Sequence, residues 1–343
     1  MPKDNETMHL PPDGPVVRTE PQGFTADQML RCDQCLRANP PIRISCLYCD
    51  AALPITESSA RLRKPTLRQP EKHELGFNCI LVPRASDLQR ESLDAAASLL
   101  KLTPEDLQRI VLSSLPLPLA RTSSLEEAQL VIERLAELGV QTLTLSDDDL
   151  GIGEGRVVRP RSLSFGRDRL VVQQSGGKGS VTLAWSELVL TVSGRLLIKK
   201  TDVKERISRR AENELLETNQ YFADELVFDL HSSSNDQSWR IGANSFDFSC
   251  LEDQKTLVAA ENLKKLQALI IAKVDTLRDD DSYGDVKTLL ELVWPYEQES
   301  QSHGLRREWL GKFSLGATTV STNEMQFTRY SRLRRYFALN RSN

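Results

Sequence analysis

Two pairs of closely spaced cysteines near the start of the chain constrain its folding more than any other feature of the 343 residues. Two residues separate Cys32 from Cys35, and two separate Cys46 from Cys49. Each pair can direct both of its sulfur atoms at one ion from a tight turn, and two such pairs complete a tetrahedral shell. The spacing therefore predicts one zinc ion bound by Cys32, Cys35, Cys46 and Cys49.

The predicted zinc shell is closed, because four thiolates leave no position for water. Such an ion is structural rather than catalytic, and metal binding supplies most of the folding free energy of so short a segment. Between the two pairs, Pro40 and Pro41 form a rigid corner, and we expect Ile42, Ile44 and Tyr48 to cover the metal. Two disulfides or an iron–sulfur cluster are the alternatives for this spacing.

The segment 31–54 resembles the short zinc ribbons of many bacterial proteins. In those ribbons a glycine usually follows the last cysteine, where this chain carries Asp50. The resemblance implies a small domain in which the metal holds two turns together.

Composition and charge limit the classes of function that the chain can have. The chain has 44 basic and 48 acidic residues and a net charge of −4, so no global field favours nucleic acid or a membrane surface. No stretch approaches the roughly 20 apolar residues of a membrane-spanning helix, and the first residues lack the apolar run of a signal peptide. We expect a cytoplasmic protein in which Cys79 and Cys250, both in apolar runs, are buried core thiols.

Local patterns predict an α+β multidomain protein. Its parts are an N-terminal four-cysteine zinc ribbon, a small βααβαβ domain, an antiparallel β domain closed by a helix, and a C-terminal basic helix. The stretches between them are rich in polar residues, proline or glycine, which favour loops or disorder. The predicted segments are a disordered tail (1–27), the zinc ribbon (28–54), a linker (55–72), the βααβαβ domain (73–147), a linker (148–160), the β domain (161–276) and a C-terminal helical segment (277–343).

The segment 73–147 alternates strands with helices that carry clear start and stop signals. Thr103 precedes a proline and two acidic residues, Ser123 or Ser124 precedes Glu126 and Glu127, and Gly139 ends the second of these helices. The passages 77–81, 102–107, 124–128 and 138–140 resemble the C-terminal domain of the bacterial ribosomal stalk protein, a fold shared with a protease adaptor. The resemblance implies a stalk-like α/β sandwich and a role in protein interaction.

The segment 161–276 reads as short strands followed by one helix. A glycine-rich turn at 176–179 separates strands 169–174 and 180–185, and an apolar stripe from Leu257 to Ile270 predicts the helix. Residues 201–224 are charged and predict a helical insertion, and His231, at a strand end, is expected at the surface. The passages 185–188 and 259–263 resemble pleckstrin-homology-like (PH-like) domains, which bind lipids, peptides or other proteins.

The C-terminal helix combines aromatic and basic residues, with Phe327, Tyr330, Leu333 and Phe337 near one face. One interpretation is a surface that contacts RNA or an anionic membrane. The other is a helix docked by its aromatic face on 294–296 and Trp309, with its arginines solvated or bound to acids such as those at 279–281. The candidate contact residues are Arg329, Arg332, Arg334 and Arg335.

These features predict a non-enzymatic, zinc-binding adaptor or scaffold that acts through protein–protein interaction. The histidines at 9, 73, 231 and 303 form no nucleophile or metal motif. One alternative is a ribosome- or nucleic-acid-associated factor that uses the ribbon and the arginine-rich helix. Another, less favoured, is peripheral membrane binding through the PH-like domain. The partner protein and the oligomeric state are left open by the sequence.

Overall fold

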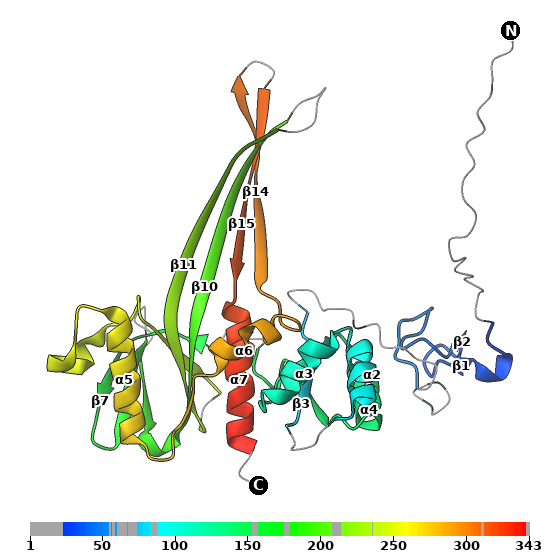
Figure 1. The fold of residues 1–343 in the computed structure, drawn as a ribbon, viewed down its shortest axis with the longest axis horizontal. Coiled ribbons are helices and arrows are strands. Elements are labelled where there is room, and N and C mark those ends of the chain that lie inside the picture. Colours follow the sequence, from blue (N-terminus) through cyan, green and yellow to red (C-terminus); the bar gives the residue numbers. More distant parts are fainter. Residues whose placement is uncertain are drawn as a thin grey trace. The chain divides into compact units, whose positions relative to one another are not determined.

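The computed structural model describes residues 23–54, 56, 59, 67, 74–83, 88–152, 157–174, 179–207, 214–234, 236–309 and 312–340. The chain is a mixed α/β protein that forms two compact units, Met1–Lys64 and Pro65–Asn343 (Figure 1). Most of the predicted tail and most of the linker 55–72 lie outside the described residues. None of the described helices combines the length and hydropathy needed to cross a membrane.

The described part of the first unit contains little regular structure. It has a 3₁₀ turn, η1 (Ala26–Gln28), and one antiparallel strand pair, β1 (Leu30–Arg31) with β2 (Ala38–Asn39). Its apolar core is small and includes two of the four cysteines: the buried members are Leu30, Cys32, Cys46 and Leu53.

The second unit opens with three strands and three helices in the order predicted for 77–146. Thr103 and Ser124 cap their helices through side-chain oxygens that accept the backbone N–H groups of Asp106 and Glu127, which confirms the predicted helix starts. The strands form an antiparallel sheet in the order β4-β3-β5. The elements are β3 (Phe77–Leu81), α2 (Arg90–Leu100), α3 (Pro104–Leu112), β4 (Pro118–Thr122), α4 (Leu125–Glu137) and β5 (Thr142–Ser146).

A second antiparallel sheet, β7-β8-β9, follows and packs with helix α5 around one apolar cluster that includes Leu170, Trp239 and Leu266. The strands flanking the glycine-rich turn and the helix that closes this region form where the sequence predicts them. The elements are β7 (Pro160–Phe165), β8 (Arg169–Gln174), β9 (Ser180–Ala184), η3 (Trp185–Glu187), η4 (Phe248–Gln254) and α5 (Ala259–Lys273).

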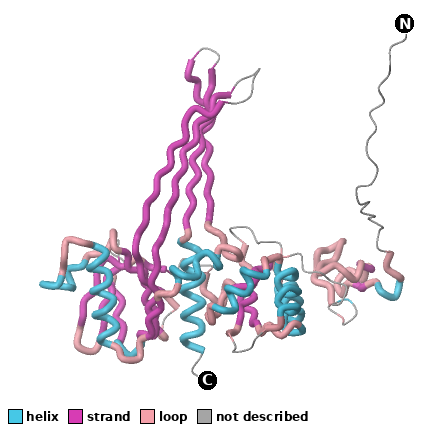
Figure 2. Tube along the Cα trace, in the orientation of Figure 1, coloured by secondary structure: helices cyan, strands magenta, loops and turns pink. Residues whose placement is uncertain are grey.

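The largest sheet has seven strands, in the order β14-β15-β10-β11-β12-β6, and β13 pairs in parallel with the lower part of β10. Helix α7 packs against β10. The long strands β10, β11, β14 and β15 continue beyond the helices (Figure 2). The elements are β6 (Val157–Val158), β10 (Leu188–Ile207), β11 (Glu214–Ser232), β12 (Ser238–Gly242), β13 (Arg278–Asp280), α6 (Tyr283–Leu290), β14 (Glu297–Trp309), β15 (Lys312–Thr322) and α7 (Glu324–Asn340).

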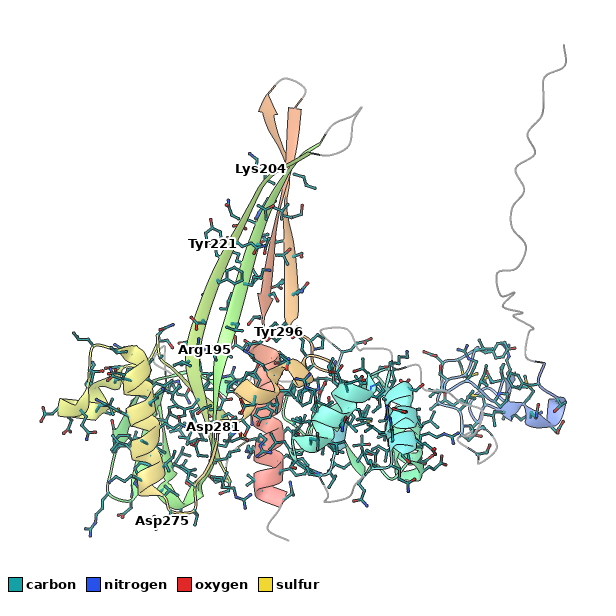
Figure 3. All side chains as sticks on the ribbon, viewed as in Figure 1. Arg195, Lys204, Tyr221, Asp275, Asp281 and Tyr296 are labelled. Carbon is teal, nitrogen blue, oxygen red and sulfur yellow. The ribbon has the colours of Figure 1, made fainter. Side chains whose placement is uncertain are left out.

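We call the outer parts of β10, β11, β14 and β15, residues 198–207, 214–223, 297–309 and 312–322, the β projection. Among its described side chains, polar groups lie on both faces, since Lys199 and Lys200 are neighbours on β10 and point to opposite sides of the sheet; Lys204 and Tyr221 are labelled in Figure 3. Tyr221 and Phe222 are 56% and 72% exposed, and the ammonium groups of Lys200 and Lys199 lie over their rings. None of its described side chains belongs to a buried apolar cluster, so this part of the sheet extends beyond the core.

Two predictions about this sheet are wrong. The segment 201–224, predicted as a helical insertion, forms the outer parts of β10 and β11 wherever it is described. The segment from 277 onward, predicted as helical, contains the β14–β15 hairpin, and the sheet crosses the predicted boundary at 276 because β13 and β15 pair with β10. Hydrogen bonds to strands distant in the sequence outweigh local helix propensity here.

Candidate functional site

The first unit brings the four predicted metal ligands together. The sulfur atoms of Cys32, Cys35, Cys46 and Cys49 all lie within 4.8 Å of one another. The Sγ–Sγ distances are 3.6 Å for Cys32 and Cys49 and 3.4 Å for Cys35 and Cys46, and all four thiols are free. These separations exceed the roughly 2.05 Å of a disulfide. They match two sulfur atoms that share one ion.

The two cysteine turns repeat the same backbone hydrogen bonds. The N–H of the residue after each pair donates to the first cysteine's carbonyl, at 2.8 Å for Leu36 to Cys32 and 3.0 Å for Asp50 to Cys46. Leu36 and Asp50 both have positive φ, 59° and 57°. This is the conformation that glycine adopts most easily, and aspartate tolerates it better than most residues. The position where ribbons usually carry glycine is thus a left-handed turn that Asp50 supplies.

Asn39 joins the two turns and is completely buried. Its side-chain oxygen accepts the N–H of Leu47 at 2.8 Å, and its amide nitrogen donates to the carbonyl of Arg37 at 2.9 Å and toward Cys46 Sγ at 3.4 Å. Such a residue behind a ligand fixes the ligand's orientation. Asn39 was not predicted from the sequence, although an asparagine between two metal-binding turns is a recognisable pattern.

The donor set fits a zinc ion. Burial raises the pKa of Cys46, but backbone hydrogen bonds from Tyr48 and Cys49 and side-chain contacts from Cys35 and Asn39 outweigh it and lower the pKa to about 6. The thiolate, which is the form that binds metal, is therefore favoured at Cys46. At Cys49 a backbone hydrogen bond from Ala51 lowers the pKa, but desolvation and hydrogen bonds with the other three cysteines outweigh it and raise the pKa to about 12, so a bound cation would have to favour the thiolate there. Four cysteine sulfurs within reach of one point match the tetrahedral preference of zinc, and these residues would hold the ion as a structural element.

The expected covering of the metal by Ile42 and Tyr48 is wrong, because these side chains are 42% and 55% exposed. Leu36 and Leu47, which flank the ligands, are 64% and 53% exposed. The residues that shield the cluster are instead the buried Leu30 and Leu53. The outer tips of both cysteine turns therefore present large apolar side chains to solvent.

The aromatic face of α7 is buried, and its arginines bind groups of the same chain. Arg329 Nε lies 3.7 Å from Asp147 Oδ1, inside the unit, and Arg332 donates to the carbonyl of Asp236. Burial lowers the pKa of Arg329, and it lowers that of Arg332 to about 10. Both side chains face the protein interior.

The other two arginines also find acceptors nearby. Arg334 forms an ion pair with Asp280, which also accepts the hydroxyl of Tyr330 at 3.1 Å. Arg335 lies 3.2 Å from Asp236. Of the two interpretations of this helix, the contacts match the docked one, in which arginines meet an acid from the run at 279–281. The main chain of the 294–296 segment takes part, since Gln326 donates to the Trp294 carbonyl at 2.8 Å.

A buried ion pair ties the main sheet to α7. Arg240 on β12 faces Asp229 on β11 and donates to both of its carboxylate oxygens, at 2.8 and 2.9 Å. Its third nitrogen donates to Glu324 at 3.1 Å, and the guanidinium lies over the ring of Phe327, 4.8 Å from its centroid. This pair was not predicted from the sequence. The available signal was a single charge inside each of two apolar strands.

His231 is completely buried, so the expectation of a surface position is wrong. Its ring nitrogens lie 2.7 Å from the hydroxyl of Ser331 on α7 and 2.9 Å from that of Ser238 on β12. Burial lowers its pKa to about 3, against an opposing effect of Asp229. The neutral ring satisfies one donor and one acceptor site, so we assign it a structural role.

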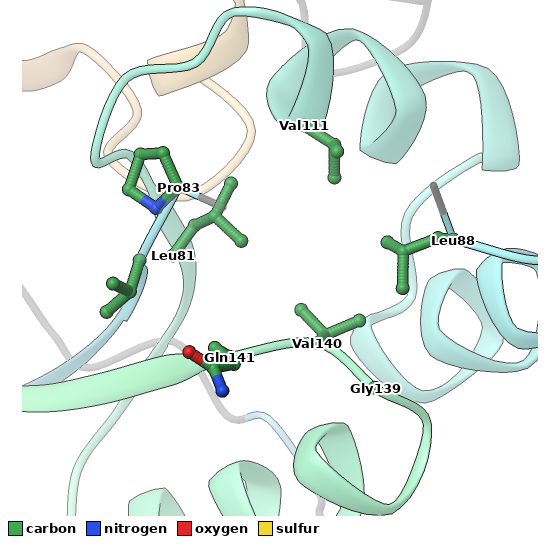
Figure 4. Close-up of a pocket in the computed structure, with 8 residues that line it drawn as sticks. Leu81, Pro83, Leu88, Val111, Gly139, Val140 and Gln141 are labelled. Carbon is green, nitrogen blue, oxygen red and sulfur yellow. The ribbon is translucent and has the colours of Figure 1, made fainter. Parts of the chain in front are cut away.

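Among the described residues of the second unit, two cavities stand out. The one drawn in Figure 4, lined by residues such as Leu81, Leu88 and Val111, holds about 20 Å³, which is room for a water molecule or two. The other is an open groove of about 460 Å³ beside α5. Two of its charged lining residues already have partners: Arg195 lies 2.8 Å from Asp224, and Asp279 accepts from Gln267 at 2.7 Å.

Comparison of the chain with family models, with curated proteins and with solved structures gives no match. The likenesses to stalk-like and PH-like domains therefore stay predictions. The four clustered cysteines support a site of the zinc-ribbon kind on geometry alone.

Proposed function

We propose that this protein is a non-enzymatic adaptor whose zinc-stabilised first unit binds a partner protein through the tips of its two cysteine turns. The observation that carries the proposal is the exposure of four large apolar side chains on or between these turns: Leu36 64%, Ile42 42%, Leu47 53% and Tyr48 55%. Full burial of a wholly exposed side chain of this size is worth about 1.5–3 kcal/mol, so covering the exposed half of each contributes roughly half of that. Because the four cysteine sulfurs lie within 4.8 Å of one another, the two turns that carry these side chains are also close together.

The chemistry of the site supports a structural rather than a catalytic metal. Four cysteine sulfurs fill a tetrahedral shell and leave no position for substrate or activated water. A metal bound in this way fixes the shape of the turns and thereby the positions of the apolar tips.

Charge favours a protein over a nucleic acid as the partner. The described part of the first unit, 23–54, carries three arginines and three aspartates. Four thiolates and one Zn²⁺ would add two negative charges, so the loaded unit would be acidic. Phosphate contacts need the opposite sign. The arginines of α7 are engaged within their own unit, which removes the second feature that suggested RNA.

The test is capture from a native lysate by wild-type protein and by a Leu47→Ser/Tyr48→Ser variant. Both side chains are exposed and neither is a ligand, so the variant should keep one zinc per chain. We expect a specific protein to be retained by the wild type and reduced about ten-fold or more by the variant. A matched variant, Leu125→Ser/Leu257→Ser, changes exposed apolar residues of the second unit and should retain the same protein.

Equal retention by the Leu47→Ser/Tyr48→Ser variant would contradict the proposal. So would recovery of RNA that is released steeply as salt rises, since counterion release is the signature of phosphate contacts. Flotation with anionic liposomes would instead support the membrane alternative.

A further inference from the structure

Asp147, which directly follows β5, is a completely buried carboxylate with a set position. Its Oδ1 atom accepts the side-chain amide of Asn78 at 2.9 Å. Its Oδ2 atom accepts the backbone N–H of Gly76 at 3.0 Å and Arg121 Nη2 at 2.5 Å. Asn78 is fixed in turn, because its oxygen accepts the indole N–H of Trp294 at 2.8 Å. The carboxylate therefore already has one bonded cation, Arg121.

Arg329 on α7 approaches the same carboxylate without a hydrogen bond to it. Its Nε atom lies 3.7 Å from Asp147 Oδ1, which is an ion-pair distance but too long for a hydrogen bond. That Nε atom is buried without a partner, and the guanidinium donates no hydrogen bond within the described part of the chain. An arginine has five N–H donors, so this residue, which is 8% exposed, leaves its hydrogen-bonding capacity unused.

The cluster also carries a surplus of positive charge. Arg121 and Arg329 share one carboxylate, and the Nε atom of Arg121 is likewise buried without a hydrogen-bond partner. Burial lowers the pKa of Arg329, Asp147 and the more distant Glu297 on β14 oppose that effect, and Arg121 adds to it. A buried cation without a bonded counter-charge is costly, and an unsatisfied buried donor in a native protein points to a bound water or ion.

An oxyanion fits this environment better than a water molecule does. A water molecule would accept N–H groups but would leave the extra charge unbalanced. A phosphate or sulfate ion does both, because its oxygens accept two parallel N–H groups of a guanidinium. Since Nε is the nitrogen of Arg329 that faces Asp147, the two Nη nitrogens are left for such an ion. The low exposure of Arg329 favours a small free ion over a phosphate ester on a larger molecule.

We propose that one free oxyanion of the phosphate or sulfate class binds at Arg329, beside Arg121 and Asp147, and completes the contact between α7 and the β4-β3-β5 sheet. The stability of the second unit then depends on the concentration of that ion. The inference goes beyond the proposed function and does not depend on it, since it uses residues of the second unit alone.

The test is thermal unfolding of the full chain near pH 7 at constant ionic strength, with sodium chloride replaced stepwise by sodium phosphate. The melting temperature of the second unit should rise with the logarithm of the phosphate concentration, by roughly 5 °C at a hundred-fold excess over the dissociation constant. Calorimetric titration with inorganic phosphate should give one site per chain. Sulfate should act in the same way, and O-phosphoserine, a larger phosphate ester, should have little effect.

Variants of Arg329 separate this site from general effects of the salt. Arg329→Met should abolish the response to phosphate. In phosphate-free buffer it should melt at the temperature of the wild type or higher, because an apolar side chain replaces an unbonded buried cation. Arg329→Lys keeps the charge but lacks the planar fork, so it should bind phosphate about ten-fold more weakly. Arg195→Met, the control, removes an exposed arginine that pairs with Asp224 and should respond as the wild type does.

An equal response to phosphate in the wild type and in Arg329→Met would overturn the proposal, because phosphate also stabilises proteins by exclusion from their surface. A marked loss of stability for Arg329→Met without phosphate would overturn it too, since Asp147 alone would then be a sufficient partner. A response to O-phosphoserine as large as the response to phosphate would overturn the assignment to a free ion.

Discussion

The two units of this protein are stabilised in opposite ways. In the described part of the first unit, the buried apolar cluster has four members, two of them cysteines, and four sulfur atoms meet at one point. The second has two extended apolar clusters and buries charges in pairs, with Arg240 on Asp229 and Arg329 beside Asp147. The contrast teaches that the first unit would be held by an ion that can be removed, whereas the second is held by contacts that only substitution can remove.

Metal removal should give the largest difference between the units. Structural zinc contributes about 10–16 kcal/mol of binding free energy in small domains, which is folding free energy where no core exists. We expect a strong chelator, or Cys46→Ser, to unfold the first unit while the second keeps its spectrum. Two-dimensional NMR together with elemental analysis measures both effects. Cys250→Ser is the control and should retain one zinc per chain, and survival of the first unit without metal would refute this contrast.

Breaking the buried ion pair should act on the second unit only. Arg240→Met leaves the Asp229 carboxylate buried without its partner, and losses of about 3–5 kcal/mol are typical. Thermal unfolding should show a lowered transition with unchanged zinc content. Arg109→Ala removes an exposed pair with Asp106 and should cost less than about 0.5 kcal/mol. A similar small cost for Arg240→Met would mean that the pair contributes little.

Acid should weaken the second unit through His231. Its folded pKa of about 3 lies below the ordinary value of 6.5, so between these values the unfolded chain binds more protons. The contribution of this residue to the free energy of unfolding is fully present above pH 6.5. It decreases as the pH is lowered, by about 2 kcal/mol at pH 5. His231→Gln cannot titrate, so its melting temperature should change less between pH 7 and pH 5. Parallel pH profiles for the two proteins would exclude this cause.

The smallest effect concerns the support behind the metal. Asn39→Ala removes the link between the two turns, and loss of such support weakens metal binding about ten-fold or more. Before the chelator is added, the variant should have the same metal-to-protein ratio as the wild type. In competition with a chromophoric chelator, it should then lose its zinc faster. Asn219→Ala, at an exposed site on β11, serves as the comparison. Unaltered affinity in Asn39→Ala would show that the two turns hold their geometry independently.

Local signals in the sequence were sufficient for some of this structure and silent on the rest. Cysteine spacing identified all four clustered sulfurs, and Thr103, Ser124 and Gly139 marked helix ends, because those interactions lie within a few residues of each other. The length of β10 was missed, since residues 201–207 become a strand only by pairing with segments far along the chain. His231 was misplaced for the same reason, because α7, which covers it, lies about a hundred residues later.

The central position of β10 has a consequence for synthesis. Strand β10 pairs with β11, β13 and β15, and the last of these strands ends at residue 322. Helix α7, which packs on β10, ends at residue 340. At about 5–20 residues per second, a ribosome needs on the order of ten seconds to deliver them after β10 emerges. β11 follows directly and can pair with one edge of β10, but the other edge has open backbone groups until β15 emerges, and the apolar base has no cover until α7 emerges. We therefore expect newly made chains to depend on a chaperone, and chains cut short before α7 to aggregate rather than to accumulate as a folded remnant.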